Sequence, residues 1–485
     1  MYVCGIDLGT QGVRVIITDM NGRVKAEAAV PFPSDSLRAS QPGYFEQDPG
    51  LWRQALYAAL RQAVANFRSA GEAADSILAL ATTSTSGTLC LVNDTGDPVR
   101  PALMYSDARA ARESVQVQDA GAEIAIKLGS RFAPSYAICK LRWLQAHEPE
   151  SIKSARWFLS PADLVTSWLS GVWGVADWTS ALKWGYDVVD LQWPSFIFDR
   201  LGFERDKFPR VQAPGSLVGH VSAAIAAQTG LATNTMVIAG ATDGTASQFA
   251  SGAVSPGQWN STLGTTLVLK GVSEQLLRDP LGRVYCHRHP DGYWLPGGAS
   301  STGADCLAQR FPQDHLPALN QTALGLSPTK LIIYPLMRKG ERFPFDKPEA
   351  TGFILGEAPD EATSYAAHLE GLAYVERLAY EVLDTLGANV SETICAVGGA
   401  THSSAGLQIR ADVLHKRLVV PQVPSGAMGA AILAARGCRY STIAQAVEQM
   451  VHWQTTVEPR PQMAAGYDEH YQRFVAACRE RGYLS

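Results

Sequence analysis

The sequence predicts an α/β protein built from two related domains that face one cleft. Segments with the apolar pattern of buried strands alternate along the chain with segments whose apolar residues recur at helical spacing. A strand, a Leu-Gly-Thr turn and a second strand occur at residues 2–18, and the same pattern returns at residues 257–269. Because a repeated pattern in a chain of 485 residues usually marks a repeated structural unit, we expect two domains of similar plan.

The first predicted element is a three-stranded meander at the N-terminus. Residues 2–6 and 13–18 are apolar and rich in β-branched side chains, and residues 24–30 alternate apolar with charged ones. The Asn-Gly pair before the third strand is a strong hairpin signal. The sequence "GTQG" at residues 9–12 joins the first two strands as a tight turn, where glycines let backbone N–H groups approach a ligand.

Asp7 ends the first strand and stands directly before this turn. A carboxylate does not bind phosphate itself, but it binds a cation that does. Asp-x-Gly-Thr after a strand therefore fits a nucleotide site in which Mg²⁺ bridges the protein and the phosphates, with the Thr10 hydroxyl as a further donor to the anion. The alternative from these residues alone is a β-hairpin turn with a capping aspartate.

Later segments continue the alternation of helices and strands. Asp48 and Pro49 begin a helix whose apolar side chains recur at i, i+3 and i+4 as far as Phe67. Residues 76–86 have the pattern of a buried strand that ends in hydroxyl groups. Residues 394–414 indicate a strand, a Gly-Gly turn and a helix whose N-terminus would face a nucleotide.

The second half of the chain repeats the opening with changed polar residues. Residues 237–243 again end an apolar strand with a carboxylate, that of Asp243. In the strand, turn and strand of residues 257–269, Ser261 stands near the place that Asp7 has in the first copy. We therefore expect a second loop suited to phosphate in the second domain.

Composition excludes several classes of protein. The net charge is −5 without a cluster of Lys and Arg residues, which argues against nucleic-acid binding. The eight cysteines form no Cys-x-x-Cys pair, which argues against a zinc site or a disulfide framework and predicts reduced thiols. The N-terminus lacks a basic leader segment and no apolar run approaches 18 residues, so we expect a cytoplasmic protein that spans no membrane.

Five motifs together resemble the FGGY carbohydrate kinases, which belong with actin and the heat-shock ATPases to one superfamily. They are "GIDLGTQGVR", "ATDGTASQFASGAV", "STLGTTLVLKG", "GGASSTGAD" and "AVGGATHSSAGLQIRADVLHKRL", in the family's order over nearly the whole chain. The resemblance implies two ribonuclease H-like domains around a central cleft. Residues 1–245 would bind the sugar, and residues 246–485 would bind ATP.

The resemblance also implies roles for single residues. Asp243 matches the general base that accepts the proton of the sugar hydroxyl, and a helix N-cap is the structural alternative. Asp7 matches the residue that orients Mg²⁺ and the phosphates, which makes it the expected metal ligand and, with Asp243 and Thr10, an expected catalytic residue. Ala400 stands where the family often has a further glycine. The expected ATP-binding residues are Gly9, Thr10, Gln11, Gly264, Thr265, Thr266, Gly298, Ser301, Gly398, Gly399 and Ala400.

The sugar pocket is where the sequence departs from the best-known members of the family. Common xylulose kinases carry Ser-Gly-Gln-Met-His-Gly after the strand that corresponds to residues 77–83, whereas this chain has "TSTSGTLCLV". Stretches such as "YSDARA" and "DWTSALKWGYD" resemble a pentulose kinase subgroup associated with D-ribulose. The structural alternatives are satisfied strand-end hydroxyls for the serines and a pair of Asp107 with Arg109. The expected substrate-binding residues are Ser84, Ser86, Asp107 and Asp243.

Three classes of function remain open at this point. The first is ATP-dependent phosphorylation of a pentulose such as D-ribulose, with D-xylulose or another polyol as the alternative substrate. The second is a chaperone-like or filament-forming ATPase, and the third is a sugar-binding regulator without catalysis. The expected partners are a small sugar and MgATP, with neither nucleic acid nor a membrane. Homodimers are common in the family, although the sequence leaves the oligomeric state open.

Overall fold

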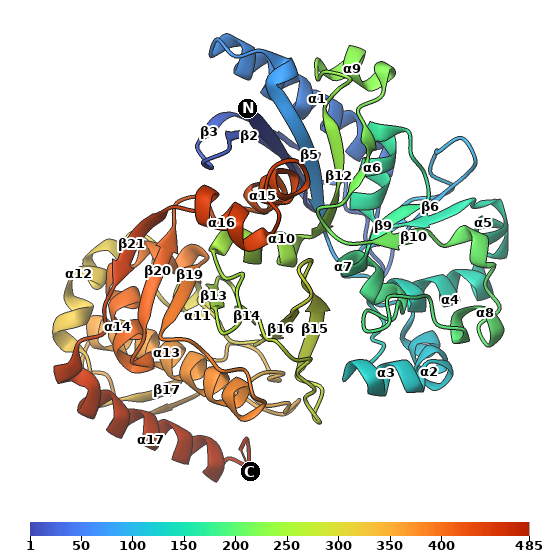
Figure 1. Cartoon of the computed structure of the whole chain (residues 1–485). Helices are drawn as coiled ribbons and strands as arrows, with labels where there is room; N and C mark the ends of the chain where they lie inside the picture. The colour runs from blue at the N-terminus through green and yellow to red at the C-terminus, as the bar shows by residue number, and fades with distance from the viewer. Residues whose placement is uncertain (485) are drawn as a thin grey trace. The chain divides into compact units, whose positions relative to one another are not determined.

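The computed structural model describes residues 1–484 and divides into two compact units (Figure 1). Unit 1 comprises Met1–Ala250, His287–Gly292 and Val423–Val451. Unit 2 comprises Ser251–Cys286, Tyr293–Gln422 and the chain from His452 onward. The sequence predicts one division after residue 245, whereas in the structure a late segment returns to unit 1. It does so because its helix packs against the strands of the first sheet.

Unit 1 is built on a six-stranded sheet with the order β11-β12-β5-β1-β2-β3. Strand β1 is antiparallel to β2 and parallel to β5, and β12 is parallel to β5 on its other side. The N-terminal meander is thereby confirmed. The strands are β1 (Tyr2–Leu8), β2 (Gly12–Asp19), β3 (Val24–Pro31), β5 (Ile77–Ser84), β11 (Leu217–His220) and β12 (Met236–Thr242).

Helices cover this sheet, and each has a local reason to form. The helix predicted from Asp48 is confirmed as α1 (Pro49–Ser69), with the Asp48 side chain accepting a hydrogen bond from Gly50 N. Its apolar stripe packs on β2 and β3, while α6 (Pro161–Ser170) packs on β5 and β12. The remaining helices of this part are α9 (Ala223–Thr229), α10 (Asp243–Ser251), α15 (Gly426–Cys438) and α16 (Ile443–Met450).

A second, largely helical part of unit 1 has a core of its own, rich in aromatic side chains (Figure 1). Phe132, Phe158, Trp184 and Phe196 are buried there, so packing accounts for these rings. Its helices are α2 (Ala111–Ala120), α3 (Ala122–Leu128), α4 (Ala137–His147), α5 (Pro149–Ser154), α7 (Trp178–Ala181) and α8 (Phe196–Asp199). Short ribbons complete it: β4 (Glu46–Gln47) with β7 (Ala102–Leu103), β6 (Cys90–Val92) with β8 (Trp157–Leu159), and β9 (Val175–Asp177) with β10 (Arg210–Gln212).

Unit 2 repeats the plan of the first sheet, with the order β15-β16-β14-β13-β19-β20-β21. Strand β13 is antiparallel to β14 and parallel to β19, as β1 is to β2 and β5. The predicted internal repeat and the two-domain α/β class are thereby confirmed. The strands are β13 (Trp259–Leu263), β14 (Leu267–Gly271), β15 (Val284–Arg288), β16 (Trp294–Ala299), β19 (Thr393–Val397), β20 (Arg417–Pro421) and β21 (Trp453–Val457).

The repeat also corrects one detail of the sequence comparison. The turns 9–11 and 264–266 both join the first two strands of their sheets, so Gly9 corresponds to Gly264. Counting back from these glycines, the residue in the place of Asp7 is Thr262 and not Ser261. Unit 2 therefore offers a hydroxyl where unit 1 has a carboxylate.

Two long helices of unit 2 share a buried ion pair. Glu376 on α13 (Glu361–Thr385) accepts hydrogen bonds from the Arg410 guanidinium on α14 (Ser404–Leu414) at 2.7 and 3.0 Å. Both side chains are almost fully buried. The other helices and strands of this unit are α11 (Asp305–Arg310), α12 (Leu316–Leu326), α17 (Ala464–Glu480), β17 (Ile332–Tyr334) and β18 (Phe353–Leu355).

Within residues 1–484, none of the helices combines the length and the apolar character that crossing a bilayer requires.

Candidate active site

Three parallel strands of unit 1 end at one edge of the sheet, and each end carries a polar side chain. Asp7 of β1 lies opposite Thr83 of β5, and Thr242 of β12 lies opposite Ser84. Asp243 follows Thr242 directly and begins α10. Two aspartates that are 236 residues apart in sequence therefore meet at the carboxyl edge of one sheet, which is where open α/β sheets bind ligands.

The two carboxylates are close enough to interact electrostatically. Burial and, to a smaller extent, the Asp243 carboxylate raise the pKa of Asp7 to about 6, although Arg14 acts in the opposite direction. Arg14 lies directly opposite Asp7 on β2. Like charges held together in a partly buried site favour the binding of a cation that neutralises them.

Helix α15 begins beside Asp7. A methyl group added at Gly426, the first residue of the helix, would lie 3.0 Å from the Asp7 carboxyl group. One added at Gly5 would lie 1.8 Å from the Ala427 carbonyl oxygen, so strand and helix touch through their backbones. A helix N-terminus presents unpaired N–H groups and favours anions. We did not predict this helix as part of the site, although the run of small residues "SGAMGAA" was the available signal.

The first predicted phosphate turn, residues 9–11, is fixed by its neighbours. Gly9 N donates to Gly12 O at 3.0 Å, and the buried Gln47 side chain donates to Thr10 O at 3.2 Å. Gln47 is fixed in turn, because it accepts a hydrogen bond from the Trp52 indole at 2.7 Å. The turn thus presents Thr10 and the exposed Gln11 next to Asp7 on a rigid support.

The backbone that leads to Asp243 is held on both sides. Gly240 allows β12 to approach β5 closely, since a methyl group there would lie 1.6 Å from Thr82 O. Thr242 N donates to the Thr179 hydroxyl of α7 at 3.0 Å. The Asp243 carboxylate accepts a hydrogen bond from Gly244 N at 2.6 Å. The position of this carboxylate is therefore set by two strands and a helix.

The predicted sugar-binding serines differ in whether their hydroxyl groups already form hydrogen bonds within the protein. Ser84 is buried and its hydroxyl accepts a hydrogen bond from Ala162 N, so it supports the start of α6. Ser86, in contrast, has a buried hydroxyl that finds no hydrogen-bond partner among the residues that the structure describes. A buried polar group without a partner is rare in folded proteins and marks a place where a ligand group can bind.

Asp107 is a structural residue, and its assignment as a sugar ligand is corrected. The carboxylate is fully buried, and it accepts hydrogen bonds from Phe45 N, Arg109 N and the Arg109 guanidinium at 2.7–3.1 Å. The guanidinium also stacks over the Tyr44 and Trp143 rings. Every acceptor site of this carboxylate is occupied, so the pair with Arg109 is the alternative that the structure shows.

In unit 2, the second predicted phosphate turn lies at residues 264–266. Ala304 N donates to Gly264 O at 2.8 Å, and Leu267 N donates to Thr302 O at 2.8 Å. A methyl group at Gly303 would lie 2.4 Å from Thr265 O. The turn is therefore packed against residues 302–304, and Thr265 is exposed at its tip.

Two other predicted nucleotide ligands, Gly298 and Ser301, make contacts within unit 2. Gly298 is buried in β16 behind the Phe343 ring, 2.9 Å from where its Cβ would stand. Ser301 N donates to the Glu341 carboxylate at 2.5 Å. Glu341 also accepts from the hydroxyls of Ser300, Thr302 and Tyr334, so it fixes this loop from behind. Sequence reasoning missed Glu341, which lies in "KGERFPF" outside any motif that we assigned to ATP.

The third predicted loop keeps an open surface. Gly398 has φ 93° and its Cβ would lie 2.6 Å from Leu263 O, so only glycine fits between β19 and β13. Gly399 is exposed with open space around it, and Ala400 follows in a short 3₁₀ turn before α14. Residues 398–400 thus lie beside the end of β13, which leads into the turn 264–266.

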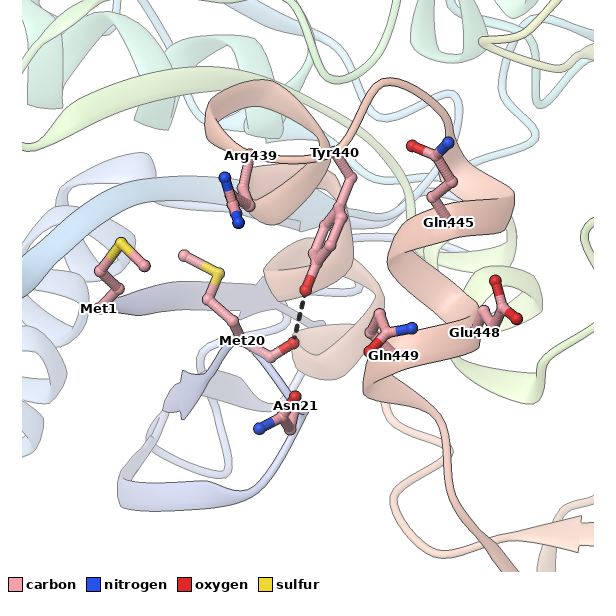
Figure 2. Close-up of a pocket in the computed structure, with 8 residues that line it drawn as sticks. All are labelled: Met1, Met20, Asn21, Arg439, Tyr440, Gln445, Glu448 and Gln449. Atoms are coloured by element: carbon pink, nitrogen blue, oxygen red, sulfur yellow. Dashed lines mark hydrogen bonds between the residues drawn. The ribbon is translucent and has the colours of Figure 1, made fainter.

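A surface hollow elsewhere in unit 1 does not belong to this site (Figure 2). It measures about 440 Å³ and is lined by Met1, Met20, Asn21, Arg439, Tyr440 and three residues of α16. The Tyr440 hydroxyl crosses it and donates to Met20 O at 2.9 Å. Met1 precedes β1 whereas Asp7 is near its other end, so the hollow lies at the opposite edge of the sheet.

The comparison with known families decides the class. The model of the N-terminal domain of the FGGY family of carbohydrate kinases matches residues 2–250, and the model of its C-terminal domain matches residues 259–438. The chain belongs to the FGGY family of carbohydrate kinases. Of the three classes left open by the sequence, family membership selects the sugar kinase, whose reaction is ATP-dependent phosphorylation of a sugar.

Individual relatives of this FGGY kinase span its whole length. The xylulose kinase of Bacillus subtilis is 27% identical over 481 residues, which cover 96% of this chain and 94% of the relative. The solved xylulose kinase of Rhodospirillum rubrum has a TM-score of 0.87 and 25% identity over 99% of both chains. The structure described as a "xyloylose kinase" from Brucella ovis has a TM-score of 0.89 and 24% identity over 100% of both chains.

The Asp7 site leads to a testable consequence for stability. The folded protein raises the pKa of Asp7 from 3.8 to about 6, so the ionised carboxylate destabilises the fold. This penalty is complete above pH 6, declines as the pH falls through 6 and is absent below 3.8. Asp7→Asn is therefore expected to raise the free energy of unfolding by about 1–3 kcal/mol at pH 7.5 and to leave it unchanged near pH 3.8.

Urea unfolding of the FGGY kinase and of the Asp7→Asn variant at a series of pH values measures this difference. Asp75→Asn is the control, because Asp75 is an exposed aspartate of the same unit. A gain in stability that is the same at all pH values would show that the Asp7 charge is not its cause.

Proposed function

We propose that this FGGY kinase phosphorylates an open-chain pentulose, with Asp243 as the general base and Asp7 as the residue that orients MgATP. The observation that carries the proposal is the meeting of Asp7 and Asp243 at one sheet edge, with the pKa of Asp7 raised toward neutrality. Carboxylates in such environments are common at catalytic centres.

The residues of unit 1 have separate roles in the proposed reaction. The sugar hydroxyl would lie next to Asp243, whose carboxylate accepts its proton as the phosphoryl group arrives. Asp7 and the Thr10 turn would face the phosphates. The Asp7 carboxylate fits a magnesium ion, since Mg²⁺ prefers one or two carboxylate oxygens together with water and phosphate oxygens. When bound, Mg²⁺ would neutralise charge on the phosphates.

The loops of unit 2 support ATP binding in this proposal. Residues 264–266 and 398–400 present backbone and hydroxyl groups at the ends of neighbouring strands, an arrangement that suits a nucleotide. Gly298 and Ser301 are secondary candidate ligands in this proposal, because the Phe343 ring lies against Gly298 and the Ser301 backbone N–H donates to Glu341. Their loop instead packs behind the turn 264–266.

The preferred sugar is proposed to be D-ribulose. The turn after β5 lacks the Met-His pair of common xylulose kinases and carries Ser86 with an unpaired hydroxyl. A pocket that pairs its buried polar groups with the hydroxyls of one sugar discriminates strongly against sugars that leave them unpaired. D-Xylulose is the second candidate, and the names of the relatives favour it.

A panel of sugars tests the proposal. ADP release is measured in a coupled assay with D-ribulose, D-xylulose, L-ribulose and glycerol at saturating MgATP. We expect kcat/KM for D-ribulose to exceed that for D-xylulose, and both to exceed that for glycerol by roughly 10-fold or more, because glycerol leaves polar groups of the pocket unpaired. ADP release without sugar is the blank. Glycerol as the best substrate, or no sugar above the blank, would refute a pentulose kinase.

A further inference from the structure

Lys183 is a charged residue that the proposed mechanism has not yet used. It lies in the 3₁₀ turn Leu182–Trp184, directly after α7. Asp177 caps α7 by accepting hydrogen bonds from Thr179 N and Ser180 N. The Thr179 hydroxyl accepts the hydrogen bond from Thr242 N. The backbone that carries Lys183 is therefore anchored to the residue that precedes Asp243.

The side chain of Lys183 extends over the turn that follows β5. A methyl group at Gly87 would lie 3.0 Å from Lys183 Cδ, so the lysine fills the space that a side chain at residue 87 would take. The Lys183 ammonium donates to Ser86 O at 3.3 Å and lies 5.8 Å from the centre of the Tyr136 ring. This turn is also where the sequence lacks the Met-His pair of common xylulose kinases.

The charges that face Lys183 come from two elements. Burial lowers the pKa of Lys183, and the Asp243 carboxylate acts in the opposite direction. Lys140 of α4 is the neighbouring cation, and the positive charge of Lys183 contributes to its lowered pKa. Lys140 is fully buried and donates to Gly87 O and Met104 O at 3.0 and 2.5 Å, so it has a structural task. Lys183 is a cation whose charge interacts with that of Asp243.

The Lys183 ammonium and the Ser86 hydroxyl can each still donate a hydrogen bond to a ligand. An ammonium group has three N–H donors, and within residues 1–484 that of Lys183 has one hydrogen-bond acceptor, at the long distance of 3.3 Å. The Ser86 hydroxyl is buried and has no hydrogen-bond partner in the same described part of the chain. Burying donors without acceptors costs free energy, so a ligand that supplies an acceptor gains affinity there.

We propose that Lys183 and Ser86 together bind the carbonyl oxygen of an open-chain ketose, beside the hydroxyl that Asp243 deprotonates. This inference rests on the proposed function and names the group by which the sugar is recognised. A carbonyl oxygen only accepts hydrogen bonds and an ammonium only donates them, so the two groups are complementary. An alditol has a hydroxyl in place of the carbonyl, so we expect the hydrogen bond from Lys183 to contribute less to its binding affinity.

Substitutions at the two donors test the proposal. The substrates are the pentulose that the unmodified kinase turns over best and the alditols obtained from it by reduction. Lys183→Met is expected to raise KM for the pentulose roughly 10–100-fold, since a hydrogen bond to a charged donor is lost, and Ser86→Ala roughly 3–10-fold. For the alditols we expect changes below about threefold, and KM for ATP is expected to stay the same.

The controls separate recognition from folding. Lys153→Met removes an exposed lysine of the same unit and is expected to change none of these constants. Lys183→Gln keeps a neutral donor and is used if the methionine variant melts at a lower temperature. If Lys183→Met raised KM for the ketose and for the alditols by the same factor, or left KM for the ketose unchanged, the assignment of Lys183 would be overturned. The kinase assignment would remain intact. An unmodified protein that phosphorylates no ketose would instead overturn the proposed function together with this inference.

Discussion

Replacement of Asp243 by asparagine is expected to lower kcat roughly 10²–10⁴-fold, which is the usual contribution of a general base. Asparagine keeps the size of the side chain and can still accept the hydrogen bond from Gly244 N. It cannot take the proton of the sugar hydroxyl as the phosphoryl group arrives. Asp243→Ala is expected to lower kcat by at least the same factor.

The measurement pairs turnover with nucleotide binding. Steady-state kinetics with the best sugar gives kcat, and calorimetry gives the affinity for MgATP, which we expect to change less than about threefold, since the predicted ATP loops lie in unit 2. Asp75→Asn, an exposed aspartate of unit 1, is the matched control and is expected to keep full activity. An Asp243→Asn enzyme with turnover within tenfold of the unmodified kinase would contradict the role of Asp243.

Breaking the buried ion pair of unit 2 is expected to have the second large effect. Glu376→Leu leaves the Arg410 guanidinium buried without its partner. Within the described chain, residues 1–484, the Nη1 atom of Arg410 already lacks a hydrogen-bond partner. Removal of one member of such a pair typically costs about 3–5 kcal/mol. For units of this size, that corresponds to a melting temperature lower by roughly 6–20 °C.

A double-mutant cycle makes this prediction sharp. Glu376→Leu combined with Arg410→Met replaces the pair by apolar side chains, and we expect it to recover most of the stability lost in either single variant. The control is Glu458→Gln, which breaks the exposed pair of Glu458 with Arg417 and is expected to cost less than about 1 kcal/mol. A double variant that melts as low as the sum of the single variants would show that the two charges do not act as a pair.

The sequence predicted those features that depend on local pattern. Apolar periodicity, the Asp48 cap and the glycines of the turns were sufficient for the meander of β1–β3, for α1 and for the strand, turn and helix around residues 394–414. The repeat of Leu-Gly-Thr was sufficient for the two similar sheets, because each copy encodes the same hairpin. These signals lie within a few residues of one another, so local physics is enough to interpret them.

In the loops, residue type alone predicted ligand-binding residues less reliably than local pattern predicted strands and helices. Asp107, Gly298 and Ser301 have the residue types of ligands, yet each is contacted by another side chain in the fold. Arg109 donates to the Asp107 carboxylate, the Phe343 ring lies against Gly298, and Glu341 accepts from the Ser301 backbone N–H. A motif shows which groups are present, whereas hydrogen-bond partners from distant segments decide whether those groups are still available. Lys183 shows the converse, since it lies in the stretch "DWTSALKWGYD" but was not predicted as a ligand, and only the tertiary structure shows its contact with Ser86 and its electrostatic interaction with Asp243.

By itself, then, the chain's order of residues determined two α/β domains, the strand ends that carry Asp7 and Asp243, and a likeness to sugar kinases. The tertiary structure decided how unit 1 is assembled, because the segment 423–451 returns to it and places the start of α15 beside Asp7. It also decided which polar groups keep unused hydrogen-bonding capacity. The physical reason is that the burial and the hydrogen-bond pairing of a polar side chain depend on contacts between residues far apart in the chain. The hydrophobic pattern predicts strands and helices but does not specify those individual contacts.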